Sequence, residues 1–377
     1  MRKIINPDTV TLFPSGDFKG RVLFSYLAEP LLWKDSDPRF GGHTNKWKSW
    51  KIAKIFQGLG YAVDAIEWTD HKFEPEKSYD VIFDIHANLQ RLTSFNARAR
   101  KILYLTGSYV DYQNSAELER LKELKKRKGV RLVPRRFIRD AGDYKKSLAL
   151  ADYCLLAGNE NTHKTFPKRY RGKIHPISNP GSHLGWRKSR GAFVPVQREF
   201  LWFSGGGAVH KGLDLVLEVF SAKPYLVLNV VGPVDHEQDF FDAYREELTR
   251  TTNIRYHGFL DPSSEEFREI VSRVFCFVAP SCSEGASSAV LTCLEIGIFP
   301  ILSRDTGVSL PRGSGFFLRD LSIGEIGSLV DKAYQIPKDE LTKRIDVVQN
   351  FVLKQHSKEK FSEDIKQHII QALKMND

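Results

Sequence analysis

The alternation of strand and helix signals along the whole chain constrains its fold more than any other feature. Short apolar runs at 21–28, 62–68 and 79–86 are separated by longer segments with helical periodicity, and the same rhythm returns at 198–207 and 225–233. Strands that alternate with helices are typical of parallel sheets whose faces are covered by helices. The sequence has no repeat at a fixed period, which argues against solenoids and propellers. We therefore predict an α/β protein.

A break near the middle of the chain predicts two domains. Residues 173–197 are rich in proline, glycine, serine and basic residues and have no sustained periodicity, which is typical of a linker. A chain of 377 residues is long enough for two domains with separate cores. We expect two similar α/β domains that face one another across a cleft: an N-terminal domain over 1–181, a linker over 182–197, a C-terminal domain over 198–355, and a final helix over 356–377 that packs back on the N-terminal domain.

The most regular helical pattern of the first half lies at 115–129. Leu118, Leu121 and Leu124 fall on one face of this helix, and Gly129 is its expected end. We expect the leucines to pack into the core of the N-terminal domain, and the next segment, 130–134, to form a strand. In the second half we expect helices from about Lys211, over 238–250 and over 287–296.

Charge is distributed unevenly along the chain. The net charge is +10, but residues 1–196 hold 36 Lys and Arg against 20 Asp and Glu, a net of +16, and the remainder is therefore at −6. We interpret this difference as a sign of different partners for the two halves. The basic half then suits an acidic partner, either an anionic lipid-linked sugar or the inner face of a membrane, contacted peripherally.

Other features favour a cytoplasmic protein. No apolar run reaches the roughly 18–20 residues that cross a bilayer, and the first residues lack the apolar core of a secretory signal. The four cysteines have no zinc-ligand spacing and are expected to be reduced, mostly buried thiols. The basic segment 121–140 contains a single aromatic residue, whereas nucleic-acid surfaces interleave basic and aromatic residues. No nucleic-acid partner is expected.

Three glycine-bearing turns are the strongest candidates for a ligand site. Each is expected to follow a strand and open a helix, where backbone amides and the helix dipole favour an anion. They are Gly41-Gly42-His43, the run 204–212 that ends in Lys211-Gly212, and the run 283–288 that contains Glu284. Lys211 adds a point charge suited to a phosphate. Neither the spacing of a Walker ATPase loop nor that of a dinucleotide-binding loop is present.

These motifs resemble a known family. SGGGAVHKGLDLVLEVF at 204–220, NIRYHGFLD at 253–261, VAPSCSEGASSAVLTCLEIGIFPILS at 278–303 and ISNPG at 177–181 look like parts of GT-B glycosyltransferases of family four. The resemblance implies two Rossmann-like domains, of which the second binds a nucleotide-sugar. It also implies a retaining, metal-independent transfer with no cofactor beyond a UDP- or GDP-linked donor, in which the leaving phosphate helps to deprotonate the acceptor.

The resemblance assigns roles to individual positions. Lys211 would hold the donor diphosphate and Glu284 would hydrogen-bond the transferred sugar; we take these two as the catalytic pair. The amides of the second turn would face the sugar and its phosphate, and the loop at 258–260 would bind the base. The donor-binding residues implied are Gly205, Gly206, Gly207, Lys211, Gly258, Phe259, Leu260, Glu284, Gly285, Ala286, Ser287, Ser288 and Thr292.

Two positions depart from the family pattern. The family usually has a second glutamate eight residues after the first, for the ribose hydroxyls, and this chain has Thr292. It also usually has an arginine five residues before the lysine, where this chain has Gly206. A threonine in place of a carboxylate lowers ribose affinity by about 1–3 kcal/mol unless another group compensates. Glu295, three residues along the same helix, is the nearest candidate.

The first half offers positional candidates for the acceptor side of the cleft. In open α/β sheets ligands lie beyond the carboxyl ends of the strands. The residues that end strands or adjoin turns there are Gly41, Gly42, His43, His86, Thr106, Gly107, Ser108, Arg135 and Arg136.

The sequence thus predicts a hexosyltransferase-type enzyme of polysaccharide or glycoconjugate biosynthesis that acts on a saccharide or lipid-linked acceptor. Two alternatives stay open: a nucleotide-sugar epimerase of the same fold, and a non-catalytic sugar or nucleotide binder.

Overall fold

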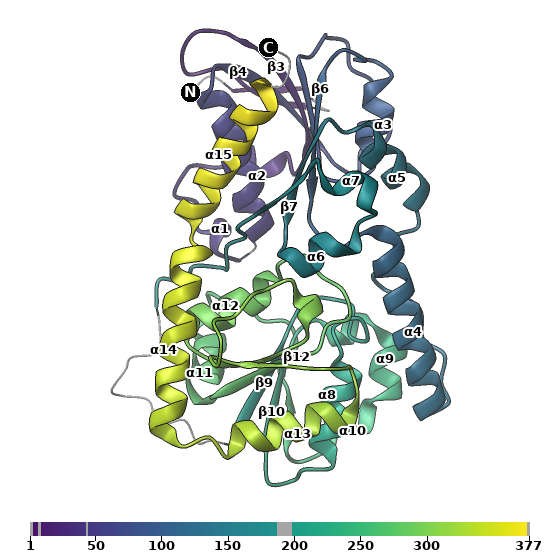
Figure 1. Ribbon diagram of the computed structural model, residues 1–377, viewed down its shortest axis with the longest axis vertical. Helices are drawn as coiled ribbons and strands as arrows, with labels where there is room; N and C mark the ends of the chain where they lie inside the picture. The colour runs from purple at the N-terminus through teal and green to yellow at the C-terminus, as the bar shows by residue number, and fades with distance from the viewer. Residues whose placement is uncertain (1–2, 7–8, 43, 187–197, 375–377) are drawn as a thin grey trace. The chain divides into compact units, whose positions relative to one another are not determined.

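The computed structural model describes residues 3–6, 9–42, 44–186 and 198–374, which form two compact units (Figure 1). The first unit comprises Met1–Val110, Arg139–Asn179 and Lys358–Asp377. The second comprises Asp111–Ile138 and Pro180–Ser357. Each unit has its own sheet and its own apolar core.

The first unit is built on an eight-stranded sheet of order β1-β2-β4-β3-β5-β6-β7-β8. The strands from β3 to β8 pair in parallel, and β1 and β2 extend the edge in antiparallel. The strand order reverses between β3 and β5. The strands are β1 (Lys3–Asn6), β2 (Thr9–Leu12), β3 (Gly20–Tyr26), β4 (Tyr61–Glu67), β5 (Val81–Asp84), β6 (Arg100–Leu105), β7 (Tyr153–Ala157) and β8 (Ile174–Ile177).

The second unit is built on a six-stranded parallel sheet of order β11-β10-β9-β12-β13-β14. In order of appearance this is 3-2-1-4-5-6, the doubly wound arrangement of a Rossmann fold, whose order reverses between β9 and β12. Its strands are β9 (Glu199–Phe203), β10 (Val227–Val231), β11 (Ile254–Tyr256), β12 (Cys276–Ala279), β13 (Phe299–Leu302) and β14 (Phe316–Phe317).

Helices cover the sheets because their apolar faces need a partner. The first unit has η1 (Glu29–Leu32), α1 (Arg39–Gly42), α2 (Thr44–Gly58), α3 (Asn88–Thr93), α5 (Ala141–Leu150), α6 (Glu160–Thr165), α7 (Lys168–Arg171) and α15 (Lys358–Lys374). The second has α8 (Leu213–Ser221), η2 (Val234–His236), α9 (Gln238–Ala243), α10 (Arg245–Thr249), α11 (Glu265–Arg273), α12 (Ser288–Ile296), η3 (Arg304–Thr306), α13 (Ile323–Tyr334) and α14 (Lys338–Gln355). Among the described residues, no helix combines the length and the apolarity needed to span a membrane.

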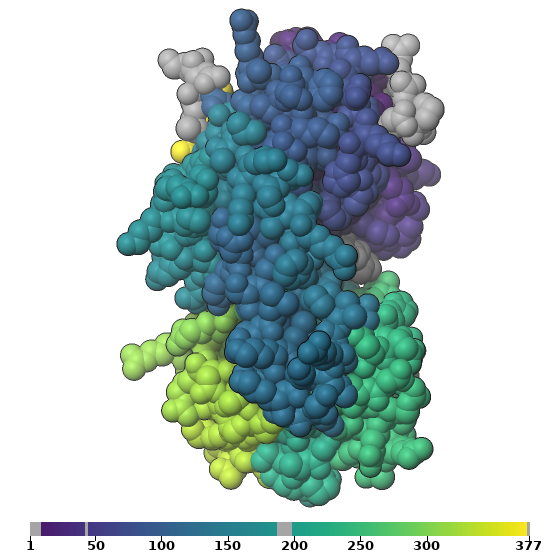
Figure 2. Space-filling view, turned by 90° about the vertical axis from the view of Figure 1, so that its right-hand side faces the viewer, coloured from purple at the N-terminus to yellow at the C-terminus, as the bar shows by residue number. Residues whose placement is uncertain are grey.

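Helix α4 (Val110–Lys128) corrects one expectation. It follows β6 of the first unit, yet from Asp111 on it belongs to the second unit, together with the loop to Ile138. Leu124 is buried in the second unit's core and Leu121 packs against it, whereas Leu118 is 48% exposed. The leucines therefore do not pack into the N-terminal core as predicted. Figure 2 shows the outer side of this segment, in blue, at the surface of the second unit.

Charged contacts fix α4 to the second unit. Asp214, fully buried in the first turn of α8, is bonded by the guanidiniums of Arg120 and Arg127 at 2.6 Å and 2.5 Å. Lys128 pairs with Glu247 at 2.5 Å. Counted by unit, 28 Lys and Arg against 20 Asp and Glu give +8 for the first, and 28 against 26 give +2 for the second. Most of the charge asymmetry along the sequence is therefore neutralised within the second unit.

Three local predictions were also wrong. Residues 130–134 form no strand, because this extended segment packs Val130 and Leu132 on the second unit's core instead of pairing with a sheet. The helix expected over 238–250 is interrupted at Tyr244. Gly41 and Gly42 end the one-turn helix α1 instead of forming an open turn, and His43 lies outside the described residues.

Candidate functional site

The two glycine turns of the second unit lie at the reversal of its strand order. The run from Ser204 follows β9, and the run from Pro280 follows β12, the strand hydrogen-bonded to β9. In doubly wound sheets ligands bind at this point, outside the carboxyl ends of the two strands. The positions of both turns were predictable from sequence; their adjacency comes from the strand order.

Lys211 and Glu284, one from each turn, form an ion pair. Their side chains are only 10% and 11% exposed. Burial lowers the pKa of Lys211 well below its usual value, and the nearby Arg136 guanidinium acts in the same direction. An anion in this site would oppose both effects and stabilise the ammonium form. The geometry therefore brings together the two side chains predicted to be catalytic.

His210 fastens the two turns to each other. Its Nε2 lies 2.5 Å from the carbonyl oxygen of Ser283, and its own carbonyl accepts the amide of Cys282 at 2.9 Å. Burial lowers the pKa of His210 to about 3, with a smaller contribution from Lys211. A neutral ring donates through Nε2, so His210 holds the turns in register. Gly212 also allows the two turns to lie close together, because a Cβ there would be 2.5 Å from the carbonyl oxygen of Pro280.

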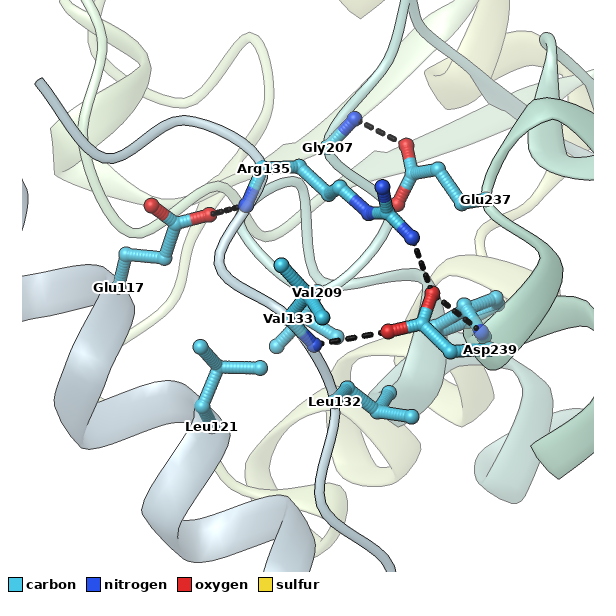
Figure 3. A pocket seen from close by; sticks show the side chains of 10 residues that line it. Glu117, Leu121, Leu132, Val133, Arg135, Gly207, Val209, Glu237 and Asp239 are labelled. Carbon is cyan, nitrogen blue, oxygen red and sulfur yellow. Dashed lines mark hydrogen bonds and ion pairs between the residues drawn. The ribbon is translucent and has the colours of Figure 1, made fainter.

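A side-chain carboxylate occupies the first turn. Glu237, at the start of α9 and 6% exposed, accepts the amides of Gly207 and Ala208 (Figure 3). The resemblance assigned Gly205, Gly206 and Gly207 to the donor, but the Gly207 amide is directed to Glu237. The turn therefore depends on side-chain cations, rather than on this amide, to hold an anion.

The second turn and the loop at 258–260 differ in exposure. Gly285 and Ala286 are buried beneath the turn, while Ser287 and Ser288 are half-buried at the start of α12. In the loop at 258–260, Gly258 adopts a left-handed φ of +71°, and its carbonyl accepts the amide of Gly232 at 2.8 Å. Phe259 is 64% exposed and Leu260 packs inward. An exposed aromatic ring beside a backbone turn suits the face of a base.

Thr292 and Glu295 have other partners in the structure. Thr292 is 1% exposed; its hydroxyl donates to the Ser288 carbonyl at 2.8 Å and accepts the Ser182 amide at 3.0 Å. Glu295 accepts the His183 amide at 3.2 Å and lies against Gly181. Both side chains hold the 181–183 segment on α12. The structure thus gives no support to a ribose contact by Thr292 or to its replacement by Glu295.

Arg135 and Arg136, expected on the acceptor side, belong to the second unit. Arg135 pairs with Asp239, whose carboxylate also accepts the Val133 amide at 2.7 Å (Figure 3). The pocket drawn in Figure 3 has a volume of about 10 Å³, room for about one water molecule. It is a packing gap, not a ligand cavity, and Arg135 fastens its rim.

The first-unit candidates lie at the ends of neighbouring strands. His86 follows β5, and its Nδ1 is 3.2 Å from Asp140 Oδ2, with Trp68 and Tyr144 edge-on to its ring. Thr106, Gly107 and Ser108 follow β6, which pairs with β5. Thr106 is exposed and Ser108 is buried. The structure therefore groups His86 with Thr106 at one sheet edge, as parallel pairing requires.

Sequence reasoning missed Glu237, Asp214 and Glu117. Glu117, on α4 and 1% exposed, accepts the amides of Arg135 and Arg136 at 2.9 Å and 2.8 Å. Each of the three carboxylates binds groups 18 to 94 residues away, so no local pattern could identify them. No group of three or more metal-ligating side chains occurs in the described residues, and the four cysteines are free and buried.

Comparison with known proteins establishes the fold. The sequence matches no protein-family model and no curated protein. Sucrose-phosphate synthase from Thermosynechococcus elongatus aligns over 93% of this chain and 98% of its own, with 13% identity and a TM-score of 0.64. HepE from Anabaena, in complex with UDP-glucose, aligns over 94% and 100%, with 11% identity and a TM-score of 0.59. A trehalose-6-phosphate synthase aligns over 94% and 98%, with 10% identity and a TM-score of 0.61. The chain has the GT-B fold of two Rossmann-like domains.

Proposed function

We propose that this protein is a retaining glycosyltransferase that moves a sugar from a nucleotide-sugar to a saccharide or lipid-linked acceptor. The observation that carries the proposal is the pairing of Lys211 with Glu284 at the switch point of the second unit's sheet. Structures of the same fold support it, since one holds UDP-glucose and another is described in terms of glycosyl transfer with retention.

In this proposal Lys211 binds the donor diphosphate. Its ammonium is buried, so its attraction to a phosphate is weakly screened by water. The bond between the sugar's anomeric carbon and the phosphate oxygen breaks in the reaction, and charge grows on the leaving diphosphate. A cation beside that oxygen stabilises the transition state more than the ground state.

Glu284 binds the transferred sugar in the same proposal. When the diphosphate takes Lys211, the Glu284 carboxylate is available to accept from a sugar hydroxyl. The acceptor oxygen forms the new bond to the anomeric carbon on the face that the phosphate leaves, and its proton passes to the leaving phosphate. No protein base and no metal ion enter this scheme.

The acceptor is assigned to the first unit. His86 and Thr106 are its best candidates, because both lie beyond the carboxyl ends of parallel strands near the reversal between β3 and β5. A saccharide or lipid-linked saccharide would place the enzyme in polysaccharide or glycoconjugate biosynthesis, acting in the cytoplasm.

Nucleotide release from a panel of nucleotide-sugars, with and without an acceptor extract, tests the proposal. Glu284→Gln keeps the side chain's shape and loses its charge, so turnover should fall roughly 10- to 1000-fold, about 1.5–4 kcal/mol. The matched control is Glu119→Gln, an exposed glutamate of α4 in the same unit. Half of the parent's turnover in Glu284→Gln would contradict the role.

The same assay separates the alternatives. A nucleotide-sugar epimerase would change the sugar without requiring an acceptor, and a non-catalytic binder would retain the donor intact. Only a transferase releases nucleotide faster when an acceptor is added.

A further inference from the structure

Arg136 lies directly over the first glycine turn. Gly207 has a φ of +96°, and a Cβ built on it would lie 2.6 Å from Arg136 Cγ and 3.0 Å from its Cδ. The aliphatic stem of Arg136 therefore fills the space that a side chain at 207 would need. Glycine at this position permits both the turn and the close approach of the arginine.

The Arg136 charge acts on the candidate site. It lowers the pKa of Lys211, and it contributes to the low pKa of His210. Two cations, Lys211 and Arg136, thus lie in one region. Glu284 pairs with Lys211, and the nearby carboxylates of Glu117 and Glu237 accept backbone amides. Arg136 itself is exposed, and the described residues give its guanidinium no ion-pair partner. Such an arrangement attracts a multiply charged anion.

The backbone of Arg136 is held in place by α4. Its amide donates to Glu117 at 2.8 Å, and its carbonyl accepts from Gln113 Nε2 at 2.6 Å. Helix α4 is in turn fixed by Arg120 to Asp214, three residues after Lys211. The same stretch of chain thus anchors α4 and carries Lys211, so the two cations are positioned by one rigid group of contacts.

We propose that Arg136 binds the donor diphosphate together with Lys211. This inference rests on the proposed function, and it identifies the guanidinium that the family pattern places at position 206, where this chain has glycine. A guanidinium can hold two phosphate oxygens at once, whereas an ammonium acts as a point charge. The loop after α4, a segment remote in sequence, then completes the donor site.

Arg135 provides the matched control. It is the neighbour of Arg136 and has the same charge, but its guanidinium is fixed to Asp239 (Figure 3). Loss of Arg136 should therefore affect the diphosphate, and loss of Arg135 should affect only the local packing.

Calorimetry with UDP, GDP and ADP, and with the corresponding nucleosides, tests the inference. For the nucleoside diphosphate that the parent binds, Arg136→Gln should weaken binding about 10- to 100-fold, equivalent to about 1.4–2.8 kcal/mol. Nucleoside binding should change less than about twofold, Arg136→Lys should retain part of the affinity, and Arg135→Gln should bind like the parent.

Two failures are distinguishable. If Lys211→Ala loses the diphosphate while Arg136→Gln binds like the parent, the inference is wrong and the proposed function stands. If the parent binds none of the three nucleotides, the proposed function fails and the inference with it. If Arg136→Gln and Arg136→Lys both lose affinity for the nucleoside as much as for the nucleoside diphosphate, the substitutions cause a structural defect. That result would also overturn the inference.

Discussion

The chain passes from the first unit to the second at α4 and returns to the first at α15, and different contacts hold the two helices in place. Each belongs to a different unit from the segment that precedes it in the sequence. Helix α4 is anchored by buried charges, with Asp214 between Arg120 and Arg127. Helix α15 is anchored by apolar side chains, and the fully buried ones are Phe361, Ile365, Ile369 and Ala372.

The two kinds of contact differ in how precisely they fix the position of a helix. Apolar burial contributes free energy but tolerates small shifts, whereas a carboxylate between two guanidiniums fixes position as well. The charged helix carries Glu117, which holds the loop of Arg136 at the candidate site. The apolar helix packs beside α2, where Phe361 meets Trp47 (Figure 1). We therefore expect α4 variants to affect ligand binding and α15 variants to affect mainly stability.

The largest effect is expected from Asp214→Asn. This change leaves the buried guanidinium of Arg120 without its carboxylate, while Arg127 keeps Glu218 at 3.1 Å. Breaking a buried pair costs about 3–5 kcal/mol. Hydrogen exchange read by peptide should accelerate in α4 and α8 and should be unchanged in α15. Exchange that rises equally in both helices would break the distinction between them. Glu123→Gln, on the exposed side of α4, is the control.

A somewhat smaller effect is expected from Ile369→Ala. The side chain is fully buried in the first unit's core, and its removal should cost about 2–4 kcal/mol through lost burial and a cavity. Exchange should accelerate in α15, β6 and β7, while nucleotide binding is preserved. A loss of nucleotide affinity as large as that of Asp214→Asn would contradict the separation of roles.

Mild acid should increase hydrogen exchange in α15 and leave exchange in α4 unchanged. His175 stacks on Tyr153 at 4.2 Å, and His368 Nδ1 is 2.6 Å from the Tyr153 hydroxyl. Burial lowers the pKa of both histidines, and the His368 charge adds to the effect on His175. The unfolded state therefore binds more protons than the folded state at these two histidines. Their contribution to stability is complete above about pH 6.5 and is lost as the pH falls toward their lower folded-state pKa values.

Exchange corrected for intrinsic rates should rise in α15 roughly two- to tenfold between pH 7 and pH 5.5. Both rings are partly exposed, so we expect this effect to be modest. The named α4 contacts contain no histidine, and burial raises the pKa of the Asp214 and Glu117 carboxyl groups. A raised pKa in the folded state means that acid does not lower stability through these groups, so exchange in α4 should not rise. His175→Phe keeps the stacking and removes one titrating group, so an unchanged pH response in this variant would refute the assignment.

The smallest effect is expected from the exposed lysines of α4. Peripheral contact with an anionic membrane stays a prediction, but Arg120, Arg127 and Lys128 are already paired with the second unit. Lys122 and Lys126 pair with Glu119 and Glu123, which leaves a net charge near +1 on this face. One unit of net positive charge contributes about 1 kcal/mol at an anionic bilayer, so this face can strengthen binding by no more than about fivefold. Replacing Lys122, Lys125 and Lys126 by Gln should therefore lose no more than that.

Co-sedimentation with neutral and anionic vesicles measures this change. A loss much greater than fivefold would mean that the α4 lysines face the membrane without their glutamates.

Sequence reasoning succeeded where the signal was local. The strand before Ser204 and the helix after it follow from apolar periodicity and from Gly212, whose φ of +72° begins α8. It failed where distant residues decide the structure. The leucine stripe of α4 shows that a partner exists, but only Asp214, some 90 residues away in sequence, shows which unit provides it. Thr292 was likewise assigned to the donor site only because it stands where the family has a glutamate, and the structure shows its hydroxyl accepting the amide of Ser182, 110 residues away.

The binding of a nucleoside diphosphate to Lys211 is the central claim, and titration calorimetry of the parent and Lys211→Ala tests it most directly. The parent should bind one of UDP, GDP and ADP more tightly than it binds the corresponding nucleoside. Lys211→Ala should lose most of that difference while nucleoside affinity is retained, because the ammonium faces the phosphates. Equal affinity of the parent for nucleoside and nucleoside diphosphate, unchanged in Lys211→Ala, would contradict the account.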